Sequence, residues 1–255
     1  MNKKHFILGG DIKKSLTEGY RLDLKSILKD AFVISKKHYL TLILACLLTF
    51  VILASSYTLM TQAFSGLGDN GAMIVNYIIT LLVAPPLLTA LQMMGVHHAI
   101  GLKSKSNDLF HYLNMTLKLS LATMMISLIT NVISVILTQT LGDLGFKLSI
   151  VVLLYLNMTF SLVYPLIAEK KVPPQMALKL SFKLVNKNLG QFTLLFIILV
   201  LLAVIALVPY GLGMIFYIPF YFNLMGIVYR QICGVGVVAT EVSDKDDTPS
   251  DEFEA

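Results

Sequence analysis

Long stretches without a charged residue constrain this chain more than any other feature. Residues 39–63 contain no Asp, Glu, Lys or Arg, and comparable stretches recur up to residue 233. Only 14% of the 255 residues are charged and 56% are hydrophobic, which is more apolar surface than a soluble fold of this size can bury. About 20 apolar residues are enough for a helix to cross the bilayer core. The sequence therefore predicts an all-α, polytopic membrane protein.

Polar turns and charged loops divide the apolar region into six expected spans. Short turns join the first span to the second, the third to the fourth and the fifth to the sixth, which favours three hairpins. The segment Gly142 to Lys147 is the turn expected in the middle hairpin. Pro85 and Pro86 should kink or locally unwind the second span. The expected spans are residues 39–63, 72–98, 119–141, 148–168, 191–208 and 212–233.

The charge pattern predicts three regions along the chain. Residues 1–38 form a basic segment that contains an amphipathic helix, and residues 39–236 form the six-helix membrane domain. Residues 237–255 are rich in acidic side chains and predict a disordered tail. Of the 20 Lys and Arg residues, Lys147 alone falls on the side opposite the termini. The positive-inside rule therefore places both termini in the cytoplasm.

Two segments that precede spans have the periodicity of amphipathic helices. From Leu24 to Phe32 apolar residues recur at helical spacing, and the segment after Pro174 has the same pattern. We expect both helices to lie at the membrane surface, where their lysines contact anionic lipids or a partner. A purely anchoring role is the alternative. The lysines are Lys25, Lys29, Lys179, Lys183 and Lys187.

The same organisation suggests an internal repeat. Each pair of spans follows a segment with amphipathic features, although the middle one, Asp108 to Lys118, shows the pattern more weakly. Proline recurs in the even-numbered spans. The chain can therefore be read as three units, each an amphipathic helix followed by a hairpin. Chance similarity between Leu-rich and Lys-rich segments is the competing explanation.

The spans offer little for catalysis or metal binding. No Asp, Glu, Lys or Arg lies in the central part of any span, which argues against a proton-coupled carrier or an acid–base enzyme. Adjacent His97 and His98 point about 100° apart on a helix and make a poor chelating pair. We predict no catalytic, cofactor-binding or metal-binding residues. The remaining polar candidates are Asn131, Asn157 and Asn223, which could form an intramembrane cluster or serve as interhelical hydrogen-bond donors.

The stretch from Tyr164 to Gly234 resembles a known family. The motifs that carry the resemblance are Tyr164-Pro165-Leu166, Glu169-Lys170, the run from Ala177 to Val185 with Asn188, and Val228-Tyr229-Arg230. They resemble the YciC-like bacterial inner-membrane proteins, and more distantly the membrane domain of some glycerophosphodiester phosphodiesterases. The resemblance implies six spans, a location in the bacterial inner membrane and no assigned activity. It implies no catalytic residues, and the phosphodiesterase's catalytic domain has no counterpart in this chain.

These observations lead to two functional hypotheses. The first is a non-enzymatic membrane protein that supports envelope or membrane organisation through membrane lipids or another inner-membrane or cytoplasmic protein. The alternative is a permease or channel for a neutral or lipidic solute, lined by the three asparagines. Because the basic residues flank spans and do not form one folded face, nucleic acid is not an expected partner.

Overall fold

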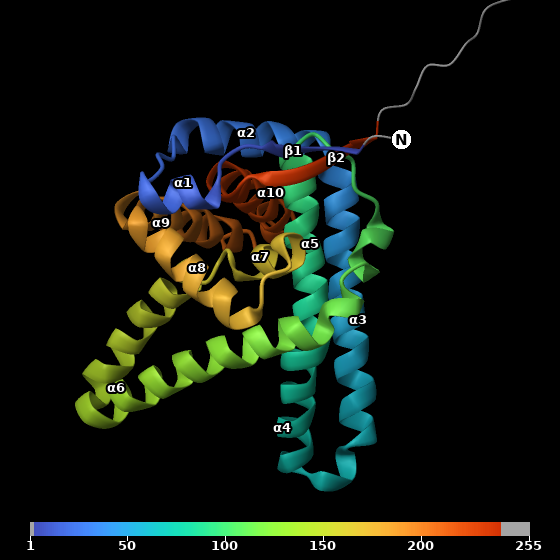
Figure 1. Cartoon of the computed structure of the whole chain (residues 1–255). Helices are drawn as coiled ribbons and strands as arrows, with labels where there is room; N and C mark the ends of the chain where they lie inside the picture. The colour runs from blue at the N-terminus through green and yellow to red at the C-terminus, as the bar shows by residue number, and fades with distance from the viewer. Residues whose placement is uncertain (1–2, 241–255) are drawn as a thin grey trace, which may run out of the picture.

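The computed structural model describes residues 3–240 and is helical almost throughout (Figure 1). This confirms the predicted all-α class, and the apolar helices are consistent with the predicted membrane character. Four helical segments are long and apolar enough to cross a membrane: Tyr39–Ala63, Asp69–Ala99, Ser106–Lys170 and Leu189–Leu207. The α-helices are α1 (Ile12–Thr17), α2 (Leu24–Lys37), α3 (Tyr39–Ala63), α4 (Asp69–Ile78), α5 (Ala84–Ala99), α6 (Thr116–Thr159), α7 (Val163–Lys170), α8 (Pro174–Lys187), α9 (Leu189–Leu207) and α10 (Met214–Cys233). Short 3₁₀ helices cover Ser65–Leu67, Ser106–Phe110 and Leu113–Met115.

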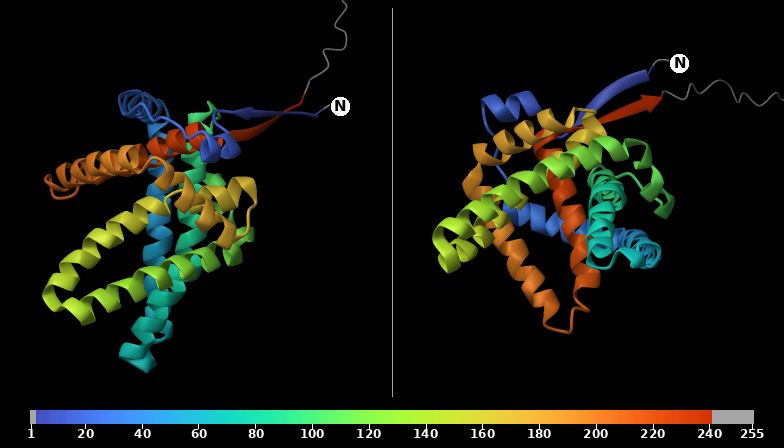
Figure 2. Two further views of the ribbon diagram at one scale, coloured as in Figure 1. Left: turned by 60° about the vertical axis from the view of Figure 1, so that its left-hand side comes forward. Right: turned by 90° about the horizontal axis from the view of Figure 1, so that it is seen from below.

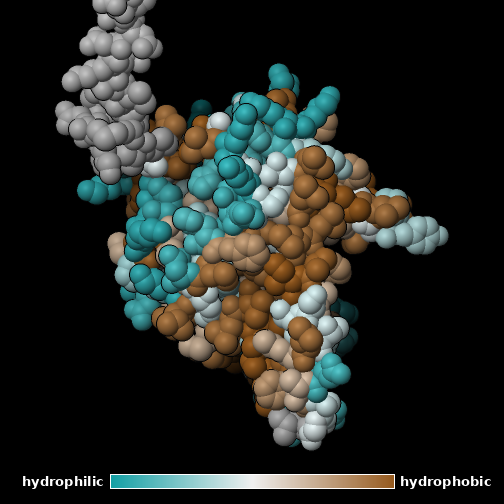
Figure 3. Space-filling model, turned by 90° about the vertical axis from the view of Figure 1, so that its right-hand side faces the viewer, coloured by the Kyte–Doolittle hydropathy of each residue, from teal (hydrophilic) through white to brown (hydrophobic). Residues whose placement is uncertain are grey.

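Three helical arms leave a common hub in different directions (Figures 1 and 2). The first arm consists of α3 and α4, the second of the two legs of α6, and the third of α9 with the first half of α10. The hub contains α2, α5, α7, α8 and the second half of α10, and most buried side chains lie there. In Figure 3, hydrophobic residues cover much of the base of the arm that points downward, while hydrophilic residues gather on the upper part of the molecule and at the arm's tip.

The centre of the hub is a close crossing of α5 and α10. A Cβ added to Gly226 would lie 2.2 Å from the Gly95 carbonyl oxygen, and one added to Gly95 would lie 2.1 Å from the Phe222 carbonyl oxygen. No side chain fits at either position. Small residues of this kind allow membrane helices to approach backbone to backbone. The contact sets the register in which the side chains of α5 and α10 meet.

Glycines with positive φ turn the chain at the arm tips. Gly68 (φ 56°, ψ −135°) and Gly142 (φ 57°, ψ −127°) have nearly the same backbone conformation, which strongly favours glycine. Each lies in a Leu-Gly-Asp sequence that is followed two residues later by a further glycine, Gly71 or Gly145. The second leg of α6 begins directly after Gly142, so the longer turn expected up to Lys147 is wrong. One glycine in this conformation is enough to reverse the chain.

The proline pair of the second span disturbs the helix just before it. A π-helix covers Ile79–Val83, and α5 begins at Ala84 with the prolines in its first turn. Proline has no N–H for the regular i to i−4 hydrogen bond, so the local unwinding expected from the sequence takes this form.

The two ends of the described chain pair in a β-ribbon that the sequence analysis does not predict. Strand β1 (Lys3–Leu8) runs antiparallel to β2 (Val235–Thr240), with Leu8 opposite Val235. The ribbon therefore includes residues 237–240 of the segment expected to be a disordered tail. The rest of that expected tail, residues 241–255, lies outside the described residues.

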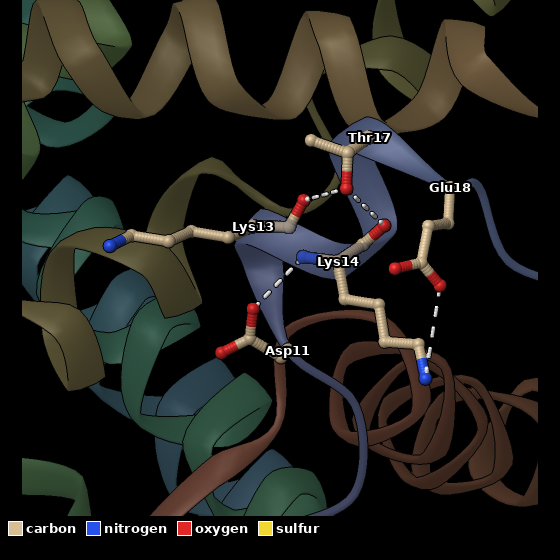
Figure 4. Close-up of polar contacts among 5 residues, drawn as sticks. All are labelled: Asp11, Lys13, Lys14, Thr17 and Glu18. Atoms are coloured by element: carbon tan, nitrogen blue, oxygen red, sulfur yellow. Dashed lines mark hydrogen bonds and ion pairs between the residues drawn. The ribbon is translucent and has the colours of Figure 1, made fainter.

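Helix α1 follows strand β1, and side-chain hydrogen bonds form at both of its ends (Figure 4). The Asp11 carboxylate accepts a hydrogen bond from the Lys14 N–H at 2.9 Å, and the Thr17 hydroxyl donates to the Lys13 carbonyl at 3.0 Å. The Ser15 hydroxyl donates to the Ile232 carbonyl at 2.7 Å and fastens α1 to the end of α10. The basic N-terminal segment is thereby folded onto the hub.

Candidate functional site: a basic cavity at the hub

The five lysines selected from the sequence lie on exposed faces of α2 and α8. The opposite faces are buried: Ile27 and Ala31 of α2, and Ala177 and Leu184 of α8, pack into the hub. The Lys187 ammonium also donates to the Thr17 carbonyl at 3.4 Å, so it holds α1 as well. The exposed lysines are Lys25, Lys29, Lys179, Lys183 and Lys187.

Large apolar side chains are exposed beside these lysines. Phe32 of α2 is 65% exposed and Phe182 of α8 is 45% exposed, and Val33 and Met176 are exposed on the same helices. A helix that shows both lysines and bare aromatic rings suits the boundary between headgroups and acyl chains. The surfaces of α2 and α8 therefore fit an anionic membrane interface better than open water.

The three candidate asparagines do not form one cluster. Asn131 and Asn157 are exposed, and each donates its side-chain amide to a carbonyl of its own helix, Ser127 at 2.7 Å and Leu153 at 2.9 Å. Asn223 is fully buried in the hub. A position near the middle of a span does not determine which way a side chain faces, and this is why the suggested convergence fails.

Asn223 belongs instead to a buried polar cluster with His98. The Asn223 Oδ1 lies 2.9 Å from His98 Nδ1, and its Nδ2 donates to the Ser35 hydroxyl at 3.0 Å. On the other side of the ring, the Ser104 hydroxyl lies 2.5 Å from His98 Nε2. His98 lies one turn beyond Gly95 on α5, and Asn223 lies one turn before Gly226 on α10. The close glycine crossing therefore brings this pair together.

A second imidazole covers the buried ring. His38, at the junction of α2 and α3, stacks on His98 with ring centroids 4.2 Å apart and an interplanar angle of 14°. Burial is the main cause that lowers the pKa of His38 below its ordinary 6.5, and the ammonium groups of Lys37 and Lys103 lower it further. The lowered pKa favours the neutral form of the His38 imidazole near pH 7.

These histidines lie at the edge of a basic cavity of about 890 Å³. Its charged lining groups are Lys37 and Arg230, and among the described residues that line it there is no Asp or Glu. The Arg230 guanidinium donates to the Ala99 carbonyl, which holds it at the end of α5. Cations without a counter-charge favour an anionic ligand. Within residues 3–240, no group of three or more His, Cys, Asp and Glu residues is placed to hold a metal ion.

Residues from the motifs that resemble the YciC-like proteins meet on the other side of α10. The buried Tyr229 hydroxyl donates to the Glu169 carboxylate at 2.8 Å, and the Gly236 N–H donates to the other oxygen of that carboxylate at 3.0 Å. Lys170 pairs with Glu169 at 3.1 Å. This carboxylate thus ties α7, α10 and β2 together, which is a structural role.

Comparison of the chain with protein-family models, with curated proteins and with solved structures finds no match. The resemblance to the YciC-like proteins therefore rests on the quoted motifs alone.

Sequence reasoning missed His38, Ser35 and Ser104 as members of the polar cluster. The sequence predicts that His97 and His98 make a poor metal pair and reach headgroups or water, whereas the structure places His98 in a buried hydrogen-bonded cluster. The available signal was the small residue one helical turn from each partner, Gly95 and Gly226. Such residues indicate where two membrane helices approach most closely.

Proposed function

We propose that the protein is a non-catalytic component of the bacterial inner membrane that contacts anionic lipids through its basic hub. In this proposal six spans form three hairpins, both termini lie in the cytoplasm, and the lysines of α2 and α8 lie at headgroup level. The protein would support membrane or envelope organisation, through these lipids or through another protein recruited to the same face.

The observation that carries the proposal is the composition of the exposed faces of α2 and α8. Both helices bury one face in the hub and present lysines together with bare apolar rings on the other. Each Lys near an anionic membrane surface contributes about 1 kcal/mol to association. The matching tip turns at Gly68 and Gly142 support the hairpin organisation of the first two arms.

The transport alternative has less support. Asn131 and Asn157 are exposed and bonded to their own helices, and Asn223 is hydrogen-bonded to His98 and Ser35 in the hub. No described cavity is lined by any of these three residues. A polar path for a solute would need such groups to face a shared space.

Native mass spectrometry of the gently extracted protein tests the proposal. The double variant Lys179→Ala and Lys183→Ala spares Lys187, whose ammonium also contacts α1. We expect it to retain clearly fewer anionic phospholipids than the wild type, because two ammonium groups at headgroup level are lost. The matched control is Lys147→Ala, which removes an exposed lysine from an arm tip. Equal retention by the double variant and the control would contradict the lipid role, and a lost stoichiometric protein would identify a partner.

A further inference from the structure

A groove lies between α2 and the third arm, and its lining is almost wholly apolar. Its volume is about 760 Å³, within the ~300–1,000 Å³ range of small-molecule sites. The rings of Tyr39 and Phe216 stack in it, with centroids 5.3 Å apart and an interplanar angle of 21°. Side chains from the outer half of α9, among them Leu202 and Ile205, form the opposite wall.

The charged group of this groove lies on the α2 side. Lys36 is the charged lining residue, and the described lining contains no Asp or Glu. The neighbouring Ser35 hydroxyl accepts a hydrogen bond from Asn223 and belongs to the buried cluster. Lys36 is exposed, in the last turn of α2. The groove thus combines a long apolar surface with one cation at its edge.

We propose that this groove binds one acyl chain of an anionic phospholipid, whose headgroup phosphate is held by Lys36. The walls come from α2, from Tyr39 at the start of α3, and from α9 and α10. Helices α3 and α9 are apolar enough to cross a membrane, so acyl chains would lie beside the groove. The apolar walls match the acyl chain, and the Lys36 ammonium, which has no Asp or Glu beside it among the described lining residues, matches the phosphate. This inference rests on the proposed function and names a lipid class and a site for it.

Tryptophan quenching tests the occupant, because the chain contains no Trp. In Phe216→Trp the only indole lies in the groove. The variant is reconstituted in phosphatidylcholine vesicles with a minor fraction of lipid brominated on its chains, either phosphatidylglycerol or phosphatidylcholine. We expect an apparent affinity about five-fold higher for the brominated phosphatidylglycerol, the fold-change that corresponds to ~1 kcal/mol for one lysine near an anionic surface. Adding Lys36→Gln should abolish that preference.

Two further variants distinguish lipid bound in the groove from lipid in the bulk bilayer. Phe50→Trp places the indole on α3 at a residue that is 70% exposed and outside the groove, so both brominated lipids should quench it equally. Ala206→Phe, combined with Phe216→Trp, fills the groove and should remove the preference without loss of helicity in circular dichroism.

Equal quenching of Phe216→Trp by both lipids would overturn the proposal. Quenching by neither lipid would also overturn it and would indicate a second copy of the chain in the groove. These outcomes are independent of lipid retention by the α8 lysines, so failure of the groove and failure of the proposed function are distinguishable.

Discussion

Asn223 holds together side chains from three helices while fully buried. Its amide bonds both His98 and Ser35, so Asn223→Leu would leave the buried His98 and the half-buried Ser35 without this partner. A buried polar group that loses its hydrogen-bond partner lowers the stability of a protein by about 1–3 kcal/mol. We expect the free energy of unfolding in detergent to fall by at least about 1 kcal/mol, as measured by denaturant titration.

The control for this variant is Asn157→Leu. Asn157 is exposed and bonds only its own helix, so the free energy of unfolding should change by no more than about 0.5 kcal/mol. If both variants lost the same free energy of unfolding, the buried cluster would contribute no more to stability than an exposed asparagine does.

His38 should make the stability of the hub depend on pH. Its pKa is lowered in the folded state, so the unfolded chain takes up the proton first as the pH falls. The His38 contribution is therefore complete above the ordinary pKa of 6.5 and is lost as the pH falls through the lower, folded pKa. We expect the wild type to lose more thermal stability than His38→Gln between about pH 8 and about pH 5.5.

His111→Gln serves as the matched control, because His111 is an exposed histidine outside the stack. This variant should lose as much thermal stability as the wild type when the pH is lowered. If His38→Gln also kept that loss in full, the source of the pH dependence would lie elsewhere.

At the level of helices, the α5–α10 crossing is the element contact that organises the hub. Gly226→Ala would place a methyl group 2.2 Å from the Gly95 carbonyl oxygen, so the two helices must separate. Overpacking of this kind costs about 1–3 kcal/mol. The thermal midpoint should fall, and the separation should also weaken the hydrogen bond between His98 and Asn223.

Gly190→Ala is the comparison at the same scale. Nothing lies within 4 Å of the added Cβ at this position in the first turn of α9, and alanine is the better helix former. Its thermal midpoint should stay the same or rise. A similar fall in both variants would mean that the crossing is not close-packed.

For the whole molecule, the arrangement of arms around one hub leads to a prediction about sidedness. In a chain with Cys46 and Cys233 replaced by alanine, single cysteines replace Lys147, Tyr210 or Lys183. We expect an impermeant maleimide to label Lys147→Cys and Tyr210→Cys on intact spheroplasts, because both residues are exposed at arm tips. Lys183→Cys on the hub should react only after lysis. The reverse pattern would contradict the proposed orientation.

The sequence by itself determined the membrane class, the bounds of α3 and the exposed lysine faces of α2 and α8. These features depend on charge-free length and helical periodicity, which are local properties of the chain. The tertiary structure alone decided that His98 meets Asn223, that Asn131 and Asn157 face outward, and that the two ends of the described chain pair as strands. Those outcomes depend on which helices approach closely, and that is set by contacts between residues far apart in sequence, which periodicity along one helix does not encode.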